Sequence, residues 1–315
     1  MKAICALVDI AKCTKGLCEI PFQHSLSRSY FSDVKTTELR PRFIIIACVV
    51  FFSSAATADG GEKVGARSMA LGGASLTMAD GWSGANNVAG LGHLHATEIG
   101  AAYAHHFFLP GVLNASFALA FPLGGGAFAL NATSIGYQGY SNSHFGVGYG
   151  RSLSDVFALG AQINGIHLNI GPGYGSRTIL VGCIGALFSP NEQLRLGVLV
   201  YNPTRTKMSA FADERVPTRF SLGAAQQYGE KVTLLVQVDK DLQYPLHVSA
   251  GLEYQLLDQL FLRTGVSTLN RSFAFGIGFK RGTWAIDLTE RWDQRLGFGA
   301  ACSFGYRFSR KGRSS

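Results

Sequence analysis

Large apolar residues and small or polar residues alternate with a period of two along most of the chain after Ile99. In residues 296–308 one parity is Leu, Phe, Ala, Cys, Phe, Tyr and Phe, and the other is Gly, Gly, Ala, Ser, Gly and Arg. Residues 272–280 repeat this pattern. Because successive side chains of a β-strand point to opposite faces, the pattern predicts strands with one bulky apolar face and one face of small residues.

The composition of the second face distinguishes between two kinds of β protein. In a soluble antiparallel sheet, one face is solvated and polar. Here the second face consists of Gly, Ala, Ser, Asn, Gln and His, with few charges. Apolar residues that face lipid and small residues that face a lumen are typical of membrane barrels. The sequence therefore predicts an all-β fold, a transmembrane antiparallel up-and-down β-barrel.

The number of alternating segments supports a barrel. Single-chain bacterial barrels have an even number of strands, and the alternation predicts fourteen. They cover residues 98–107, 113–122, 126–135, 143–152, 156–168, 177–187, 194–201, 217–227, 232–239, 246–256, 260–267, 272–279, 283–290 and 296–308.

The predicted connections differ in length between the two ends of the barrel. Those after even-numbered strands are short, whereas those after odd-numbered strands include the longest, residues 202–216, as well as 169–176 and 136–142. Short periplasmic turns and longer external loops are the usual asymmetry. We therefore expect residue 98, at the start of the barrel, to lie on the periplasmic side.

Composition and charge exclude other classes. The 315 residues include 39 Gly, and charged residues make up only 15%, which argues against a helical bundle and against a disordered chain. The net charge of +8 lies mostly at the ends, so residues 59–308 carry only +2. A nucleic-acid-binding domain would concentrate Lys and Arg on its folded body, and we expect no nucleic-acid partner.

The first 58 residues are predicted to be a leader. The apolar run FIIIACVVFF at residues 43–52 follows Arg40 and Arg42 and precedes the small residues SSAATA, the three parts of a secretory signal peptide. We expect cleavage near Ala58 and a start site set too far upstream, with residues 1–39 lying before the signal. Residues 59–97 then precede the barrel, residues 98–308 form it, and residues 309–315 are a basic tail.

Three short stretches between the leader and the first strand carry a family resemblance. Residues 65–74 read GARSMALGGA, residues 79–82 read ADGW, and residues 86–91 read NNVAGL. They resemble the start of the FadL-type hydrophobic-compound transporters and of the related PorV/PorQ-type outer-membrane proteins, where GAR-x-M-x-x-GGA is followed by ADD and NPAGL. The sequence departs from that pattern at Gly81 and at Val88.

The resemblance implies a fourteen-stranded barrel whose residues 59–97 fold inward as a plug. Arg67 and Asp80 are then candidates for a charge pair in the lumen, and Asn87 for hydrogen bonding in a turn. These residues either fasten the plug or contact a ligand. Sharp turns against the inner wall are expected at glycines, and the plug candidates among them are Gly72, Gly73 and Gly90.

The end of the last strand resembles the assembly signal of outer-membrane barrels. Tyr306 and Phe308 alternate with Arg307, and seven residues follow. This pattern implies the barrel-assembly machinery as a partner, together with outer-membrane lipid.

The sequence offers little for catalysis or for metal binding. His93 and His95 share a parity, but only Glu98 stands near them as a further ligand, so no metal site is expected. Asn142, Ser143 and His144 are the residue types of a lipid hydrolase, yet adjacent strand residues point to opposite faces. We therefore expect no enzyme and no cofactor.

Three functions remain open. The first is a conduit for hydrophobic small molecules in a Gram-negative outer membrane. The second is a PorV-like scaffold or shuttle of a protein secretion system, with the charged loop 202–216 as the surface that contacts secretion proteins. A barrel-embedded lipid hydrolase is the least favoured.

Overall fold

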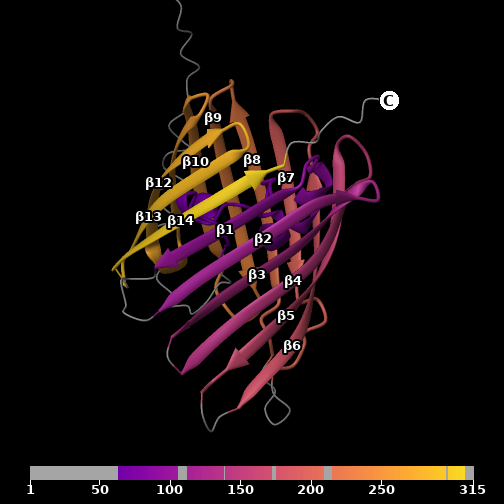
Figure 1. Cartoon of the computed structure of the whole chain (residues 1–315), viewed down its shortest axis with the longest axis vertical. Helices are drawn as coiled ribbons and strands as arrows, with labels where there is room; N and C mark the ends of the chain where they lie inside the picture. The colour runs from indigo at the N-terminus through magenta and orange to yellow at the C-terminus, as the bar shows by residue number, and fades with distance from the viewer. Residues whose placement is uncertain are drawn as a thin grey trace, which may run out of the picture. The chain divides into compact units, whose positions relative to one another are not determined.

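A computed structural model of the chain describes residues 63–105, 112–137, 139–171, 175–208, 215–295 and 297–308. The predicted leader, its signal peptide and cleavage site, and the basic tail lie outside these residues. Within them, strands form a closed barrel in which each strand pairs antiparallel with the next and β1 pairs with β14 (Figure 1). The prediction of a fourteen-stranded up-and-down barrel is confirmed.

The strand bounds lie close to those that the alternation predicts. The strands are β1 (Glu98–His105), β2 (Leu113–Leu123), β3 (Gly126–Tyr137), β4 (Tyr140–Ser152), β5 (Phe157–Asn169), β6 (Ser176–Phe188), β7 (Leu194–Tyr201), β8 (Arg219–Tyr228), β9 (Val232–Asp241), β10 (His247–Leu257), β11 (Leu260–Ser267), β12 (Ser272–Arg281), β13 (Trp284–Asp293) and β14 (Gly297–Arg307). A short 3-10 helix, η4 (Leu269–Arg271), lies between β11 and β12.

The two faces of the wall have the expected chemistry. On β12, Phe273, Phe275 and Ile277 are exposed on the outer face, whereas Ser272 and Ala274 are buried on the inner face. The same division holds on the other strands, so large apolar residues form a continuous exposed outer surface. Exposed apolar area of this extent is that of a transmembrane barrel, whose outer wall contacts lipid.

The connection between β3 and β4 is shorter than predicted. We expected a long connection over residues 136–142, but β3 extends to Tyr137 and β4 begins at Tyr140. Tyr137 and Tyr140 face each other with ring centroids 5.6 Å apart, and Gly139 has a φ of 97°. The strands continue to a tight turn because this aromatic pair and a left-handed glycine close it.

Residues 63–97, called the luminal segment below, lie inside the barrel. The segment contains α2 (Ala66–Ala70), α3 (Ser83–Asn86) and η3 (Val88–His93). Helix α2 contacts β11–β14, whereas η3 contacts β3–β6 on the opposite part of the wall (Figure 1). Among the described residues no helix has the length and apolarity needed to cross a membrane.

The connection between β7 and β8 also reaches inward. Its described residues Met208 and Val216 pack on Ile166 and Ile179, which belong to the inner faces of β5 and β6. Asn202 fixes the base of this connection, since its Nδ2 donates to the Val216 carbonyl at 2.7 Å and its Oδ1 accepts from the Thr206 amide at 3.0 Å. Residues 209–214, part of the predicted partner loop, lie outside the described residues.

Candidate functional site

Helix α2 ends just before Gly72 and Gly73, two of the three predicted plug glycines. The Gly73 amide donates to the Ser68 carbonyl at 2.9 Å, and the Gly72 amide donates to the Met69 carbonyl at 3.1 Å. These two bonds form a Schellman motif, which needs a left-handed residue directly after the helix cap. Gly72 has the required φ of 66° and Gly73 has a φ of 89°. The chain therefore turns sharply against β11, as the two glycines led us to expect.

The middle of the luminal segment is held to the wall by two buried amides. Asn87 accepts from the Ala89 amide at 3.2 Å, and its Nδ2 donates to the carbonyls of Leu76 at 2.8 Å and Ala186 at 3.4 Å. From β9, the Gln237 Oε1 accepts from the amides of Ser75 and Leu76 at 3.0 Å each. Both side chains are almost fully buried, so each compensates backbone groups that have lost water.

Glycines on the inner wall let the segment approach the strands closely. A Cβ at Gly160 would lie 2.7 Å from the carbonyl oxygen of Val88, and one at Gly251 would lie 2.7 Å from that of Leu71. Gly90, the third predicted plug glycine, meets the Met78 carbonyl in the same way at 2.6 Å. The surplus of glycine in the sequence is thus used where backbone packs on backbone.

Charged side chains form a network where α2 meets β10–β13. Arg67 donates to both carboxylate oxygens of Glu253, at 2.9 and 2.8 Å, and to Asp80 at 3.3 Å. Arg263 lies between Glu253 and Asp287 and donates to each at 2.6 Å. Two arginines thereby contact three carboxylates, one from the luminal segment and two from the strands β10 and β13. Bidentate arginine–carboxylate pairs of this kind also fix orientation.

Asp80 also shapes the turn that precedes α3. Its carboxylate accepts from the Trp82 amide at 3.0 Å, and its own amide donates to Ser83 Oγ at 2.9 Å. Burial raises the pKa of Asp80, and the Arg67 guanidinium opposes this rise. Burial alone would lower the pKa of Arg67, but Glu253 and Asp80 raise it above the ordinary value, so the guanidinium stays charged.

A separate ion pair lies at the start of the described segment. Lys63 Nζ is 3.8 Å from the Asp239 carboxylate of β9. Burial lowers the pKa of Lys63 to about 8, and the nearby Asp239 carboxylate limits this fall. The ammonium is therefore held in a place that disfavours its charge.

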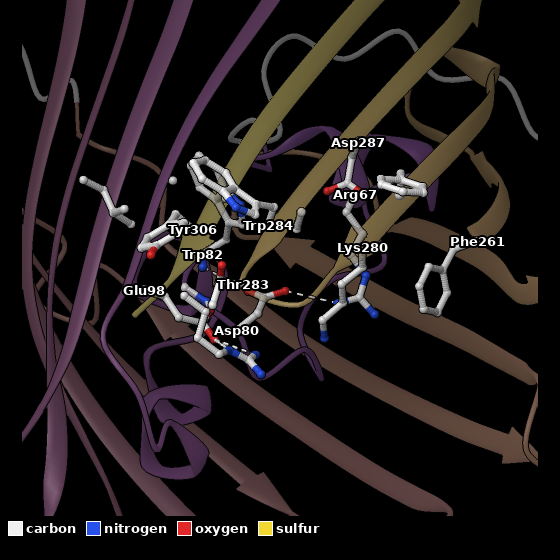
Figure 2. Close-up of a pocket in the computed structure, with 18 of the residues that line it drawn as sticks. Arg67, Asp80, Trp82, Glu98, Phe261, Lys280, Thr283, Trp284, Asp287 and Tyr306 are labelled. Atoms are coloured by element: carbon white, nitrogen blue, oxygen red, sulfur yellow. Dashed lines mark hydrogen bonds and ion pairs between the residues drawn. The ribbon is translucent and has the colours of Figure 1, made fainter. Parts of the chain in front are cut away.

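A cavity of about 220 Å³ lies between the ionic network and the barrel end at which β12, β14 and the luminal segment meet (Figure 2). Trp82 from the luminal segment lies beside it, and Trp284, Tyr306 and Lys280 come from the strands. Glu98 closes one side, accepting from Arg307 Nε and from the Gly81 amide, each at 2.6 Å. Gly81, a departure from the family pattern, thus supplies a backbone donor here.

Sequence reasoning identified only part of this site. Arg67 and Asp80 do form an ion pair, and Asn87 does bond within a turn; contact of any of them with a ligand stays a prediction. Glu253, Arg263 and Asp287 were not among the site residues predicted from the sequence. Each is a charged residue at an inward parity next to a small inward residue, namely Gly251, Gly265 and Ala285, and that mismatch is the signal that could have revealed them.

The histidines near the first strand and the stretch Asn142–His144 lie in different parts of the barrel. His93 and His95 line a wider cavity of about 750 Å³ at the same barrel end, beside the turns after β2 and β4. No group of three or more His, Cys, Asp or Glu suited to a metal occurs in the described part of the chain. Ser143 Oγ faces Ser134 Oγ at 3.1 Å on the outer face, whereas the next residue, His144, points inward.

The predicted assembly signal lies at the same end of the barrel. Tyr306 is in β14, and its ring contacts those of Trp284 and Phe308 at centroid distances of 4.7 and 4.8 Å. Interfacial aromatics of this kind are typical of membrane barrels. Their recognition by an assembly machinery stays a prediction.

Solved structures of transport barrels share this fold. The Ralstonia pickettii toluene transporter TbuX aligns with a TM-score of 0.62 and 12% identity over 79% of this chain and 99% of that chain. The Pseudomonas putida toluene transporter TodX gives 0.61 and 13% over 81% and 100%. A Pseudomonas aeruginosa FadL homologue gives 0.51 and 14% over 78% and 97%.

Because the sequence identities are low, these similarities show a shared fold. The resemblance to FadL-type barrels that the N-terminal motifs suggest is confirmed at that level. The resemblance to PorV/PorQ-type proteins stays a prediction. No model of a known protein family and no curated protein matches the sequence.

Proposed function

We propose that the protein is an outer-membrane conduit for hydrophobic small molecules. The observation that carries this proposal is the arrangement of the barrel interior: a luminal segment fills the centre of a membrane-type barrel and leaves two cavities at one barrel end. The shared fold with two toluene transporters and a FadL homologue supports it.

The interior is unsuited to an open water-filled pore. Leu71, Leu76, Val88 and Leu91 of the luminal segment are fully buried against the wall, so apolar side chains occupy the space that water fills in a porin. An ion or sugar that entered such a packed interior would lose its hydration, whereas a small apolar molecule would not. The packed interior thus argues against a wide aqueous pore, and the hydrophobic cargo is proposed from the fold shared with the toluene transporters and the FadL homologue.

The proposed location follows from the outer surface. The exposed apolar band matches that of bacterial outer-membrane barrels, and the predicted signal peptide would export the chain. Fractionation of cells expressing the full-length chain tests this: the protein should sediment with outer membranes and resist carbonate extraction.

Uptake measurements test the transport function. Cells that lack the gene should take up labelled toluene and labelled long-chain fatty acid more slowly than the same cells with the gene restored. Uptake of a small sugar serves as the control, since it should not depend on the protein. Equal uptake of both hydrophobic probes with and without the barrel would refute the proposal.

A further inference from the structure

The cavity beside Trp82 contains more charge than transport of a pure hydrocarbon requires. Four carboxylates and four cationic side chains line it. Arg67 and Arg263 bind Asp80, Glu253 and Asp287, and Arg307 binds Glu98. Three arginines thus contact all four carboxylates, and one negative charge of the set is not balanced by an arginine.

Lys280 is the fourth cation of the lining and brings its formal charge to zero, but it takes no part in these ion pairs. It is the last residue of β12 at an inward parity, it is exposed at this end of the barrel, and it lines the cavity beside Arg67 (Figure 2). Its ammonium makes no ion pair or hydrogen bond with any residue in the part of the chain that the structure describes. Three N–H donors therefore face the cavity without a protein acceptor.

The rest of the cavity wall is aromatic. Trp82, Phe261, Trp284 and Tyr306 line it together with backbone at Gly278 and Gly305. Its volume of about 220 Å³ exceeds that of an engineered cavity of about 150 Å³ that binds benzene. One aromatic ring with a small substituent fits such a space.

We propose that this cavity binds a small aromatic carboxylate, with the ring against Trp82 and the carboxylate on the Lys280 ammonium. This inference rests on the proposed conduit function and narrows its substrate class. The carboxylate, rather than a neutral polar group, is favoured because a charge-assisted hydrogen bond is about twice as strong as a neutral one. The neighbouring arginines are already paired, so they position Glu253 and Asp287 and leave the ligand to Lys280.

Binding to the purified full-length barrel in detergent tests this assignment. Sodium benzoate and toluene are titrated at neutral pH into wild type, Lys280→Met and Lys280→Arg. Loss of a hydrogen bond to a charged group costs about 1.5–3 kcal/mol, so Lys280→Met should weaken benzoate affinity roughly tenfold or more. Lys280→Arg should restore it, and toluene affinity should be similar in all three proteins.

Lys231→Met is the matched control. Lys231 is exposed in the β8–β9 turn at the same end of the barrel and does not line the cavity, so its removal should leave benzoate affinity unchanged. If Lys231→Met weakens benzoate binding as much as Lys280→Met does, the effect is one of general surface charge and the inference is wrong.

A second readout locates the ligand. The chain has three tryptophans, and replacing Trp284 and Trp292 by Phe leaves Trp82 as the only one. In this variant benzoate should change the Trp82 emission, with the affinity that calorimetry measures for the same variant, because Trp284 itself lines the cavity. Benzoate binding without any change at Trp82 would overturn the assignment, as would the absence of benzoate binding to wild type.

The two proposals can fail separately. If benzoate binding depends on Lys280 but uptake does not depend on the protein, the binding site is supported and the conduit function is refuted. If toluene uptake depends on the protein but benzoate binding does not depend on Lys280, the conduit function is supported and the carboxylate site is refuted.

Discussion

The luminal segment meets the two sides of the barrel wall by different chemistry. On the β9–β14 side, Lys63 and Arg67 form ion pairs with Asp239 and Glu253. On the β3–β6 side, η3 lies on glycines, and no ion pair between described residues involves those strands. Both sides use glycines of the wall, since Gly251 and Gly265 also admit the end of α2, but only the β9–β14 side adds ion pairs to them.

This difference has consequences for how each side responds to change. A glycine contact is lost gradually, since a larger side chain pushes the segment away by its own volume. A buried ionic network fails abruptly, because removing one member leaves a partner charge uncompensated. The ionic side is therefore the side at which a single substitution, or a charged ligand, affects the segment most.

The largest expected effect is at Arg263. Its side chain is 5% exposed and binds both Glu253 and Asp287, so Arg263→Met leaves two buried carboxylates with less compensation. Breaking a buried pair from one side costs about 3–5 kcal/mol. Urea unfolding in lipid vesicles, followed by tryptophan fluorescence, should show a loss of that order. Arg281→Met, at an exposed position on β12, should change stability little; equal losses would contradict the special role of the network.

A smaller effect is expected at the glycine side. Gly160→Val places side-chain atoms where the Val88 backbone lies, and overpacking of this kind costs about 1–3 kcal/mol. The luminal segment should become more accessible to protease while the barrel still migrates as a folded species in cold SDS gels. Gly182→Val is the control, because a Cβ there meets nothing within 4 Å. If both variants expose the segment equally, the contact at Val88 is not what holds it.

The fold was predictable because the alternation is local. A period of two needs only neighbouring residues, so the fourteen strands and their inner and outer faces follow from the sequence alone. The β3–β4 connection was misjudged because Tyr137, Gly139 and Tyr140 look like loop residues one by one. Their pairing across the turn shows only once the register is known.

The site was predictable only where its residues lie close in sequence. Arg67 and Asp80 are 13 residues apart and belong to recognisable motifs. Glu253 lies 186 residues from Arg67, and the two meet because barrel closure brings β10 beside α2. The alternation predicts which face of a strand each residue occupies, but not the register between neighbouring strands. It therefore cannot predict which inward residues lie at the same height along the barrel axis.

The Lys63 pair should give the ionic side a pH dependence that the glycine side lacks. The folded pKa of about 8 lies below the ordinary value of 10.5, so between these values the folded state binds fewer protons than the unfolded state. Stability therefore rises with pH in that window, by about 1 kcal/mol between pH 7 and 9. Unfolding at both pH values measures this, and Lys63→Met should abolish the rise. A rise that persists in Lys63→Met would assign it to another group.

The smallest effect is expected at Asp80, although it belongs to the same network. Its contact with Arg67 is the longest in the network at 3.3 Å, and burial raises its pKa, so the charge is not strongly favoured there. Asp80→Asn keeps an acceptor for the Trp82 amide and leaves the Arg67–Glu253 pair intact, so we expect a loss below about 1 kcal/mol at pH 7. Because the folded pKa lies above the ordinary value, the acid contributes more at low pH, and the loss should grow as pH falls. Glu253→Gln, which weakens contacts to both arginines, should cost several times more at pH 7. Equal losses for the two variants would mean that the network acts as one unit, in which the length of each contact does not rank its contribution.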